Sequence, residues 1–267
     1  PAGADEYRPS AHAGVYVPTA NPAVPMWGKR KPWLMGNAAQ FRPAAPPALA
    51  SAAWQRDYDE VKSLGARNSV ARSPEQAEIA RFWEYSLPSI YFAASCSMAG
   101  KPGRDAVSNA RMLAAAAQAM DDSLIAVFEA KYHYNFWRPT TAIRNGDLDG
   151  NAATERQGDW TPLIDVPMHP EYPSGHSILA ASVGAVLAAE FGGMEAGPLA
   201  ASSPSAKGAV RKWNTIADFV NEVSAARVYA GIHFRTATTV GAEMGAKIGT
   251  LAARETKASL ASVAAAR

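Results

Sequence analysis

From Ser51 onward, apolar and polar positions follow the three-to-four-residue spacing of amphipathic helices, and no segment of any length alternates with the period of a strand. Ser73-Pro74-Glu75-Gln76 has the order of a helix start: a cap, a proline in the first position and an acidic first turn. This helix is predicted to run toward Ser97, with an interruption at Pro88. Further helices are predicted from about Asp105 to Lys131, from Ser174, from about Pro204 to Ala230, and from about Thr236 to Ala261. The pattern therefore predicts a mainly α protein.

Residues 1–50 differ from the rest of the chain. They hold nine of the nineteen prolines and few periodic apolar positions, which is typical of an extended arm. Trp27, Trp33 and Phe41 would allow such an arm to pack on a protein surface. We therefore expect two parts: a Pro-rich arm over residues 1–50 packed on the domain, and a helical catalytic domain over residues 51–267.

Composition narrows the classes of function. Hydrophobic residues make up 48% and charged residues 19% of the chain, as in ordinary soluble globular proteins. A net charge of +2 gives no argument for binding nucleic acid or an anionic membrane. The longest nearly uncharged run, Ser174 to Ala189, is too short to span a bilayer. The chain starts at Pro1, so a leader has been removed or a longer protein continues upstream; a removed leader would make it secreted or periplasmic.

The single cysteine, Cys96, lies in an apolar stretch and is expected to be a small buried residue. More informative chemistry gathers in three separated clusters, each of them weak evidence alone. They are Lys131-Tyr-His-Tyr-Asn-Phe-Trp-Arg138-Pro139, His169-Pro-Glu-Tyr-Pro-Ser174-Gly175-His176-Ser177, and Arg227-Val-Tyr-Ala-Gly231-Ile-His233-Phe-Arg235.

The second cluster predicts an anion site. Pro173 ends an extended segment, Ser174 is a good N-cap, and an apolar run follows. Gly175 and His176 then occupy the first helical turn, where backbone N–H groups lack internal partners and the helix dipole is positive. Because glycine has no side chain, an anion could approach the backbone closely there.

The third cluster implies a helix end. Arg227 and His233 are six residues apart, so a continuous helix would turn them roughly 120° away from each other. Gly231 offers a break that would release His233 into a short connector. We therefore place Arg227 near the end of one helix and His233 in the turn that follows.

The first cluster adds two cations. Arg138 precedes Pro139, so its backbone should be extended beyond the end of the helix that carries Lys131. Together with Arg227 these residues would supply three fixed positive charges from separate segments. Guanidinium groups match the oxygens of phosphate-like anions and stay charged. The combination predicts a pocket for a tetrahedral oxyanion.

The three clusters together, K-x6-R-P, P-S-G-H and R-x5-H, resemble the three-part signature shared by vanadium-dependent haloperoxidases and PAP2-type acid phosphatases. The details F-W-R-P and P-x-Y-P-S-G-H are closer to the soluble haloperoxidase branch. The resemblance implies a helical bundle of the acid phosphatase/vanadium haloperoxidase type. It implies vanadate as the cofactor, or phosphate or sulfate in the same site.

The resemblance also implies roles for individual residues. His176 would be the general acid/base, and His233 would coordinate vanadium in a haloperoxidase or be the phosphorylated nucleophile in a phosphatase. His169 would support the site from behind, at a position where bromide-type haloperoxidases carry His and chloride-type ones Phe. The oxyanion-binding set would be Lys131, Arg138, Ser174, Gly175 and Arg227.

Two departures from the signature keep alternatives open. Ala226 stands where the family has Ser, and Ala237 stands where it has an Asp that orients the histidine. The loss of that carboxylate weighs against a phosphatase, and another acceptor must orient His233. The favoured function is halide oxidation with hydrogen peroxide. The alternatives are a soluble acid phosphatase acting on phosphate esters through a phosphohistidine, and a non-catalytic module that binds an oxyanion or a partner. Because family members have further upstream helices, we also expect a homo-oligomer or association with such a segment.

Overall fold

The computed structural model describes residues 12–85 and 88–265, and this part of the chain is mainly helical, as the sequence predicts. Two strands form a hairpin, and three short 3-10 helices lie at Trp27–Lys29 (η1), Gly146–Leu148 (η2) and Pro204–Ala206 (η3). The α-helices are α1 (Ala52–Gly65), α2 (Pro74–Phe82), α3 (Pro88–Ala99), α4 (Ala106–Tyr134), α5 (Pro139–Arg144), α6 (Gly175–Phe191), α7 (Ile216–Tyr229) and α8 (Arg235–Ala265).

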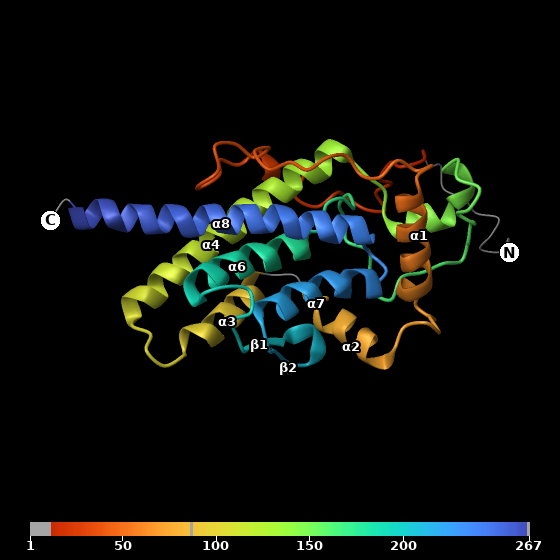
Figure 1. Ribbon diagram of the computed structural model, residues 1–267. Helices are drawn as coiled ribbons and strands as arrows, with labels where there is room; N and C mark the ends of the chain where they lie inside the picture. Colours follow the sequence, from red (N-terminus) through yellow and green to blue (C-terminus); the bar gives the residue numbers. More distant parts are fainter. Residues whose placement is uncertain (1–11, 86–87, 266–267) are drawn as a thin grey trace.

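Helix α6 is the centre of the bundle. It packs on α4, α7 and α8, which lie around it in Figure 1. Its residues from Ser177 to Gly184 are all buried, which explains why the sequence there is apolar without a polar face. The main core contains side chains from α3, α4, α6, α7 and α8. This packing holds the N-terminus of α6 in the interior.

Glycines allow α8 to lie against the backbone of α6. Gly241, Gly245 and Gly249 recur every fourth residue and therefore share one face of α8. A Cβ atom at Gly245 would lie 2.2 Å from the carbonyl oxygen of Ile178, and one at Gly249 would lie 2.1 Å from that of Ser182. A Cβ at Gly241 would meet the carbonyl oxygen of Ser174 at 2.7 Å. The close helix pair thus fixes the start of α6.

We expect Gly245→Val to lower the free energy of unfolding by about 1–3 kcal/mol, because the added side chain must push α8 away from α6. Ala246→Val is the matched control, since Ala246 is the next residue of the same helix and is exposed. It should cost below about 1 kcal/mol, the difference in helix propensity. Chemical denaturation of both variants measures the two values. Equal stability losses would contradict the close packing.

Several helix starts match the sequence prediction. Ser73 caps α2 in a capping box with Gln76, and Ser174 caps α6 through the backbone N–H of Ser177. The helix predicted from Ser73 is interrupted, as expected, before Pro88: α2 ends at Phe82 and α3 begins at Pro88. Local capping chemistry was therefore a sound guide to these boundaries.

The predicted helix from Pro204 to Ala230 is wrong over its first part. Strands β1 (Leu199–Ser203) and β2 (Ala209–Trp213) pair there in antiparallel register, with Leu199 opposite Trp213. Lys207 and Gly208 adopt positive φ angles of 54° and 79°, which turn the chain back. Leu199 and Trp213 are buried in the main core, so tertiary packing outweighs local helix propensity. Helix α7 begins only at Ile216.

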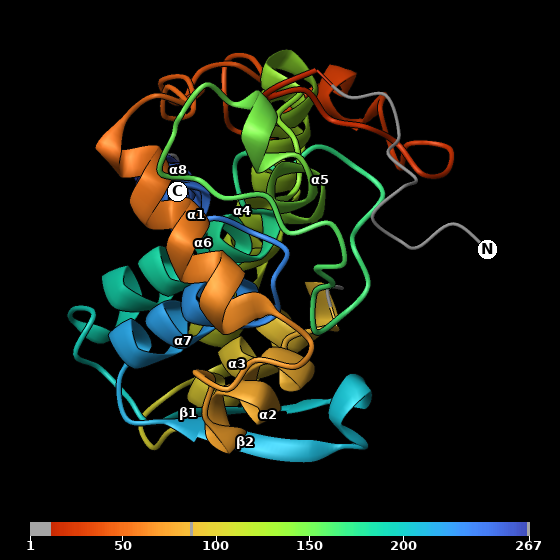
Figure 2. The ribbon, with the colours of Figure 1, turned by 90° about the vertical axis from the view of Figure 1, so that its right-hand side faces the viewer.

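Residues 12–50 lie as extended coil along α4, on the opposite side of the molecule from the hairpin (Figures 1 and 2). Asp122 of α4 accepts hydrogen bonds from the backbone N–H groups of Trp33, Leu34 and Met35, at 2.7, 2.9 and 3.1 Å. Asp122 thus anchors this part of the arm to α4. The division into an arm and a catalytic domain near residue 50 stays a prediction.

Cys96 also differs from expectation, because it is exposed and not buried. It lies on α3, whose opposite face carries the buried residues Tyr91, Ala94 and Met98. Within the described residues, no helix is both long and apolar enough to cross a membrane. Secretion or a periplasmic location stays a prediction.

Candidate functional site

One cavity of about 500 Å³ gathers residues from all three sequence clusters. Two predicted residues lie just behind its wall: Arg138, whose Nη1 lies 3.4 Å from Nε2 of His233, and Ser174, which is buried under the first turn of α6. The predicted residues that line the cavity itself are Lys131, His169, Gly175, His176, Arg227 and His233.

A helix break brings Arg227 and His233 to the same cavity. Helix α7 ends at Tyr229, Gly231 has a φ of +78°, and α8 begins at Arg235, so His233 lies in the connector. A Cβ atom at Gly231 would lie 2.4 Å from the carbonyl oxygen of Gly65 at the end of α1. Both the positive φ and this close approach require glycine. The break that the sequence suggested is present.

Glu171 orients His233. Its Oε1 lies 2.7 Å from Nδ1 of His233 and accepts the backbone N–H of Phe234 at 3.0 Å. Burial, followed by the charge of Arg138, lowers the pKa of His233 well below its ordinary value, so the ring is neutral. Because Oε1 already accepts one N–H, we assign the histidine proton to Nδ1 as a second donor. Nε2 then presents its lone pair on the side of Arg138 and the cavity.

Burial raises the pKa of Glu171 to about 8, while Arg138 and Lys131 act in the opposite direction. The residue is fully buried, and Oε2 has no hydrogen-bond partner among the described residues. A buried carboxyl group that lacks a partner on one oxygen can be ionised only if neighbouring cations stabilise its negative charge. Its charge state is thus coupled to theirs.

Within the described part of the chain, Lys131 and Arg138 are held by main-chain oxygens and not by ion pairs. Lys131 Nζ donates to the carbonyl groups of Pro170 at 2.9 Å and Glu171 at 2.8 Å. Arg138 donates to the carbonyl groups of His169 at 2.9 Å and Ile232 at 2.8 Å. Burial, followed by the charge of Arg138, lowers the pKa of Lys131 well below its usual range. Fixed carbonyl contacts position both cations before any ligand arrives.

His169 supports Arg138 from the cavity wall. Its Nδ1 lies 2.9 Å from Nη2 of Arg138, and its ring packs edge-on against Phe128 with 5.3 Å between centroids. Burial lowers the pKa of His169 well below the ordinary value, so the ring is neutral. Nδ1 also lies 3.2 Å from the carbonyl oxygen of Pro170, but it must accept from the guanidinium because arginine can only donate. The position thus contacts a cation of the site directly.

The part of the cavity next to α6 has polar atoms that lack partners. Nε2 of His176 and Nε of Arg227 are buried without a hydrogen bond in the described part of the chain. A Cβ atom at Gly175 would meet no atom within 4 Å, so open space lies before the first turn of α6. Buried polar atoms need partners. Three buried cations, a helix N-terminus and these unpartnered nitrogens fit a tetrahedral oxyanion.

Burial, followed by the charge of Arg227, lowers the pKa of His176 well below its usual value, so this ring is also neutral. A bound oxyanion would reverse that effect by favouring the protonated form of His176. Anion binding should therefore be accompanied by proton uptake.

We expect sulfate to bind more weakly as the pH rises, by up to about tenfold per pH unit for each proton taken up. Sulfate does not titrate near neutrality, so the linkage belongs to the protein. Calorimetric titrations in two buffers with different ionisation enthalpies count the protons, and His176→Ala should take up fewer than the wild type. Sulfate affinity that is independent of pH from about pH 6 to about pH 8 would contradict the depressed pKa values.

Sequence reasoning missed Glu171, although it lies inside the second cluster between His169 and Pro173. The need for some acceptor to replace the carboxylate missing at Ala237 was recognised, but not its identity. An acidic residue in an otherwise apolar, proline-rich segment was the available signal. Its pairing with a histidine 62 residues away is a tertiary contact that no spacing reveals.

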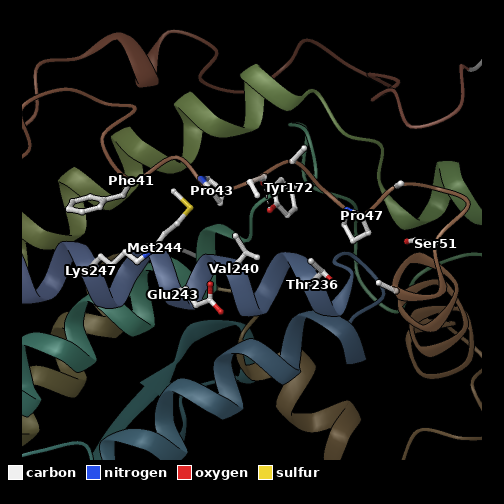
Figure 3. A pocket seen from close by; sticks show the side chains of 14 residues that line it. Phe41, Pro43, Pro47, Ser51, Tyr172, Thr236, Val240, Glu243, Met244 and Lys247 are labelled. Carbon is white, nitrogen blue, oxygen red and sulfur yellow. Dashed lines mark hydrogen bonds between the residues drawn. The ribbon is translucent and has the colours of Figure 1, made fainter.

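A second cavity, of about 520 Å³, lies between the arm and α8 and contains none of the predicted site residues. Figure 3 shows Phe41, Pro43 and Pro47 of the arm facing Val240 and Met244 of α8. The charged residues that line it are Glu243 and Lys247, and its lining contains no histidine or arginine. We assign no chemistry to it, and the expected association with a second copy or upstream helices stays a prediction.

The residues described here include no group of three or more His, Cys, Asp or Glu side chains placed to hold a metal cation. The cavity described above instead presents cationic donors and one histidine nitrogen. That composition suits an anionic oxo species of a metal and not a bare divalent ion.

Comparisons with known proteins concern the family and the fold of the chain. A family model described as the VCPO second helical-bundle domain matches residues 111–262. The structure of a bacterial vanadium-dependent iodoperoxidase is similar, with a TM-score of 0.77 and 28% identity over 90% of this chain and 60% of that one. That of an apo-type bacterial vanadium-dependent chloroperoxidase has a TM-score of 0.73 and 21% identity, over 91% of this chain and 57% of that one. A search of curated proteins finds no significant match. The chain thus spans about three fifths of the length of these two structures.

Proposed function

Because the chain belongs to the family of the VCPO second helical-bundle domain, we propose that it is a vanadate-dependent haloperoxidase that oxidises halide with hydrogen peroxide. The observation that carries this proposal is the state of His233. Its Nδ1 is fixed by Glu171, and its Nε2 lone pair lies beside a cavity of buried cations. A neutral, oriented imidazole of this kind is suited to coordinate a metal.

The residues present fit vanadate. Lys131, Arg138 and Arg227 would neutralise its oxygens, and the first turn of α6 at Gly175 would donate backbone hydrogen bonds. His233 Nε2 would be the one protein ligand to vanadium. When bound, vanadate supplies a Lewis acid that activates hydrogen peroxide toward halide without a redox change of its own.

His176 is proposed to move protons during turnover. The balanced reaction converts hydrogen peroxide, halide and one proton into hypohalous acid and water. Nε2 of His176 is buried, unpartnered within the described residues and neutral in the free site, so it can take up that proton and deliver it. The fixed cations next to it would stabilise negative charge on the reacting oxygens.

The proposal is tested by measuring bromide and iodide oxidation by hydrogen peroxide with and without added orthovanadate, after phosphate has been dialysed away. We expect turnover only with orthovanadate, and competition by phosphate for the same site. Absence of vanadate-dependent oxidation of either halide by folded protein would reject the proposal.

A second candidate is phosphate ester hydrolysis through a phosphohistidine. The absent carboxylate at Ala237 counted against it, but Glu171 places a carboxylate on Nδ1 of His233 and thereby removes that objection. In that case orthovanadate should inhibit hydrolysis of p-nitrophenyl phosphate and support no halide oxidation. The opposite effects of vanadate separate the two activities.

A further inference from the structure

The cavity is larger than a tetrahedral oxyanion needs. Its volume of about 500 Å³ lies in the range of pockets that bind drug-sized organic molecules. The cationic floor described above occupies one part of its lining. Most of the remaining wall is apolar and includes Val24, Trp27, Leu124, Phe128, Ile164 and Leu179. Two exposed acidic residues, Glu84 and Asp165, also line the cavity.

Residues 23–27 form a roof segment that the arm contributes to this wall, and the roof is pinned at both ends. The backbone N–H of Ala23 donates to Met168 at 2.6 Å, and the Tyr132 hydroxyl donates to the carbonyl group of Ala23 at 2.6 Å. Beyond the roof, a Cβ atom at Gly28 would lie 2.5 Å from the backbone nitrogen of Glu129 on α4. The arm cannot shift there without losing these contacts.

The backbone of the roof is also strained. Val24 has a φ of 47°, which β-branched residues rarely adopt, and its carbonyl group accepts the backbone N–H of Trp27 at 3.0 Å. This turn places both Val24 and Trp27 on the cavity, while Met26 between them is 61% exposed. Strain of this kind persists where surrounding contacts fix a functional shape.

Trp27 has the properties of an aromatic recognition residue. The Arg30 guanidinium lies 4.4 Å from the centroid of its ring and holds it in place. Its indole Nε1 is buried and has no hydrogen-bond partner in the described part of the chain. The ring of Phe128, from α4, lines the same cavity. Two aromatic rings and a free N–H donor suit a planar molecule with a polar substituent.

We propose that this apolar part of the cavity binds an electron-rich aromatic molecule, a phenol or an indole, as the organic acceptor of the oxidised halogen. The acceptor role rests on the proposed haloperoxidase function. Hypohalous acid formed at the cationic floor would transfer its halogen to a ring carbon of the bound acceptor. The carbon–hydrogen bond is replaced by a carbon–halogen bond, and the released proton combines with hydroxide of the hypohalous acid as water.

Binding is tested first, without peroxide. 2-Naphthol is titrated into the orthovanadate-loaded protein and followed by ligand-observed NMR. Trp27→Ala should raise the Kd by about tenfold, the effect of one lost aromatic contact. Met26→Ala is the matched control, because the neighbouring side chain of the same turn is exposed. It should leave the Kd unchanged.

A second variant covers the case in which Trp27→Ala loosens the arm. Leu124→Trp, on α4, adds bulk to the cavity and leaves the roof intact, and it should also weaken 2-naphthol binding by about tenfold or more. Wild-type protein that binds no 2-naphthol, or equal Kd values for the wild type and both cavity variants, would overturn the inference.

Product analysis tests the acceptor role. The ratio of ortho to para bromination of phenol by the wild-type enzyme should differ from the ratio given by free hypobromous acid, and Trp27→Ala should move it toward the free reagent. Wild-type bromide oxidation with the ratio of the free reagent would overturn the acceptor site while leaving the proposed function intact. Naphthol binding without any vanadate-dependent halide oxidation would instead overturn the proposed function, and the acceptor role with it.

Discussion

Glu171→Gln is expected to lower the kcat of vanadate-dependent halide oxidation by about a hundredfold or more. The variant keeps the size of the side chain but removes its negative charge. A glutamine amide can donate to Nδ1 of His233, which would move the histidine proton to Nε2 and block the lone pair on the cavity side. Vanadate affinity should fall by about 10- to 100-fold for the same reason.

Glu243→Gln is the matched control, since Glu243 is exposed on α8 and lines the other cavity. Its kcat and vanadate affinity should equal those of the wild type. Thermal melting of both variants separates loss of orientation from loss of fold. If folded Glu171→Gln kept wild-type kcat and vanadate affinity, the carboxylate would have no part in orienting His233.

His233→Ala should reduce halide oxidation by about a thousandfold or more and yet weaken sulfate binding by only about tenfold. Three buried cations and the N-terminus of α6 would hold the anion chiefly by electrostatics, and these remain in the variant. The proposed reaction, by contrast, would need the bond from His233 Nε2 that fixes the position of the cofactor. Steady-state kinetics and sulfate calorimetry measure the two effects separately.

His133→Ala serves as the control for this experiment, because His133 is exposed near the C-terminal end of α4. It should leave both the kinetics and the sulfate affinity unchanged. Substantial halide oxidation by His233→Ala would show that the histidine is not the ligand. Complete loss of sulfate binding in a folded variant would show that the cations alone cannot hold the anion.

Much of the helical framework was predictable because it depends on local chemistry. Ser73 and Ser174 cap helices through their own turns, and Gly231 ends a turn that only glycine tolerates, so each is visible in the sequence. The hairpin was missed because Leu199 and Trp213 are buried by contacts with distant helices. A local signal for the correct start of α7 existed, since Thr215 and Asp218 form a capping box.

Only the residues that belong to the three sequence clusters could be assigned to the site from the sequence. The spacing of Lys131, Gly175 and Arg227 within their clusters predicted a shared anion pocket, and all three line one cavity. The contact of Glu171 with His233 joins two of those clusters and could not be derived from either alone. The roof at Trp27 was also missed, because an extended arm has no periodicity that indicates which side chains face inward.

The central claim is that Nε2 of His233, held by Glu171, is the protein ligand to vanadium. Vanadium K-edge X-ray absorption of the orthovanadate-loaded protein tests it most directly. One nitrogen neighbour of vanadium is expected in the wild type, absent from orthovanadate-loaded His233→Ala and retained in His133→Ala. Identical spectra for the wild type and His233→Ala, with oxygen neighbours only, would contradict it.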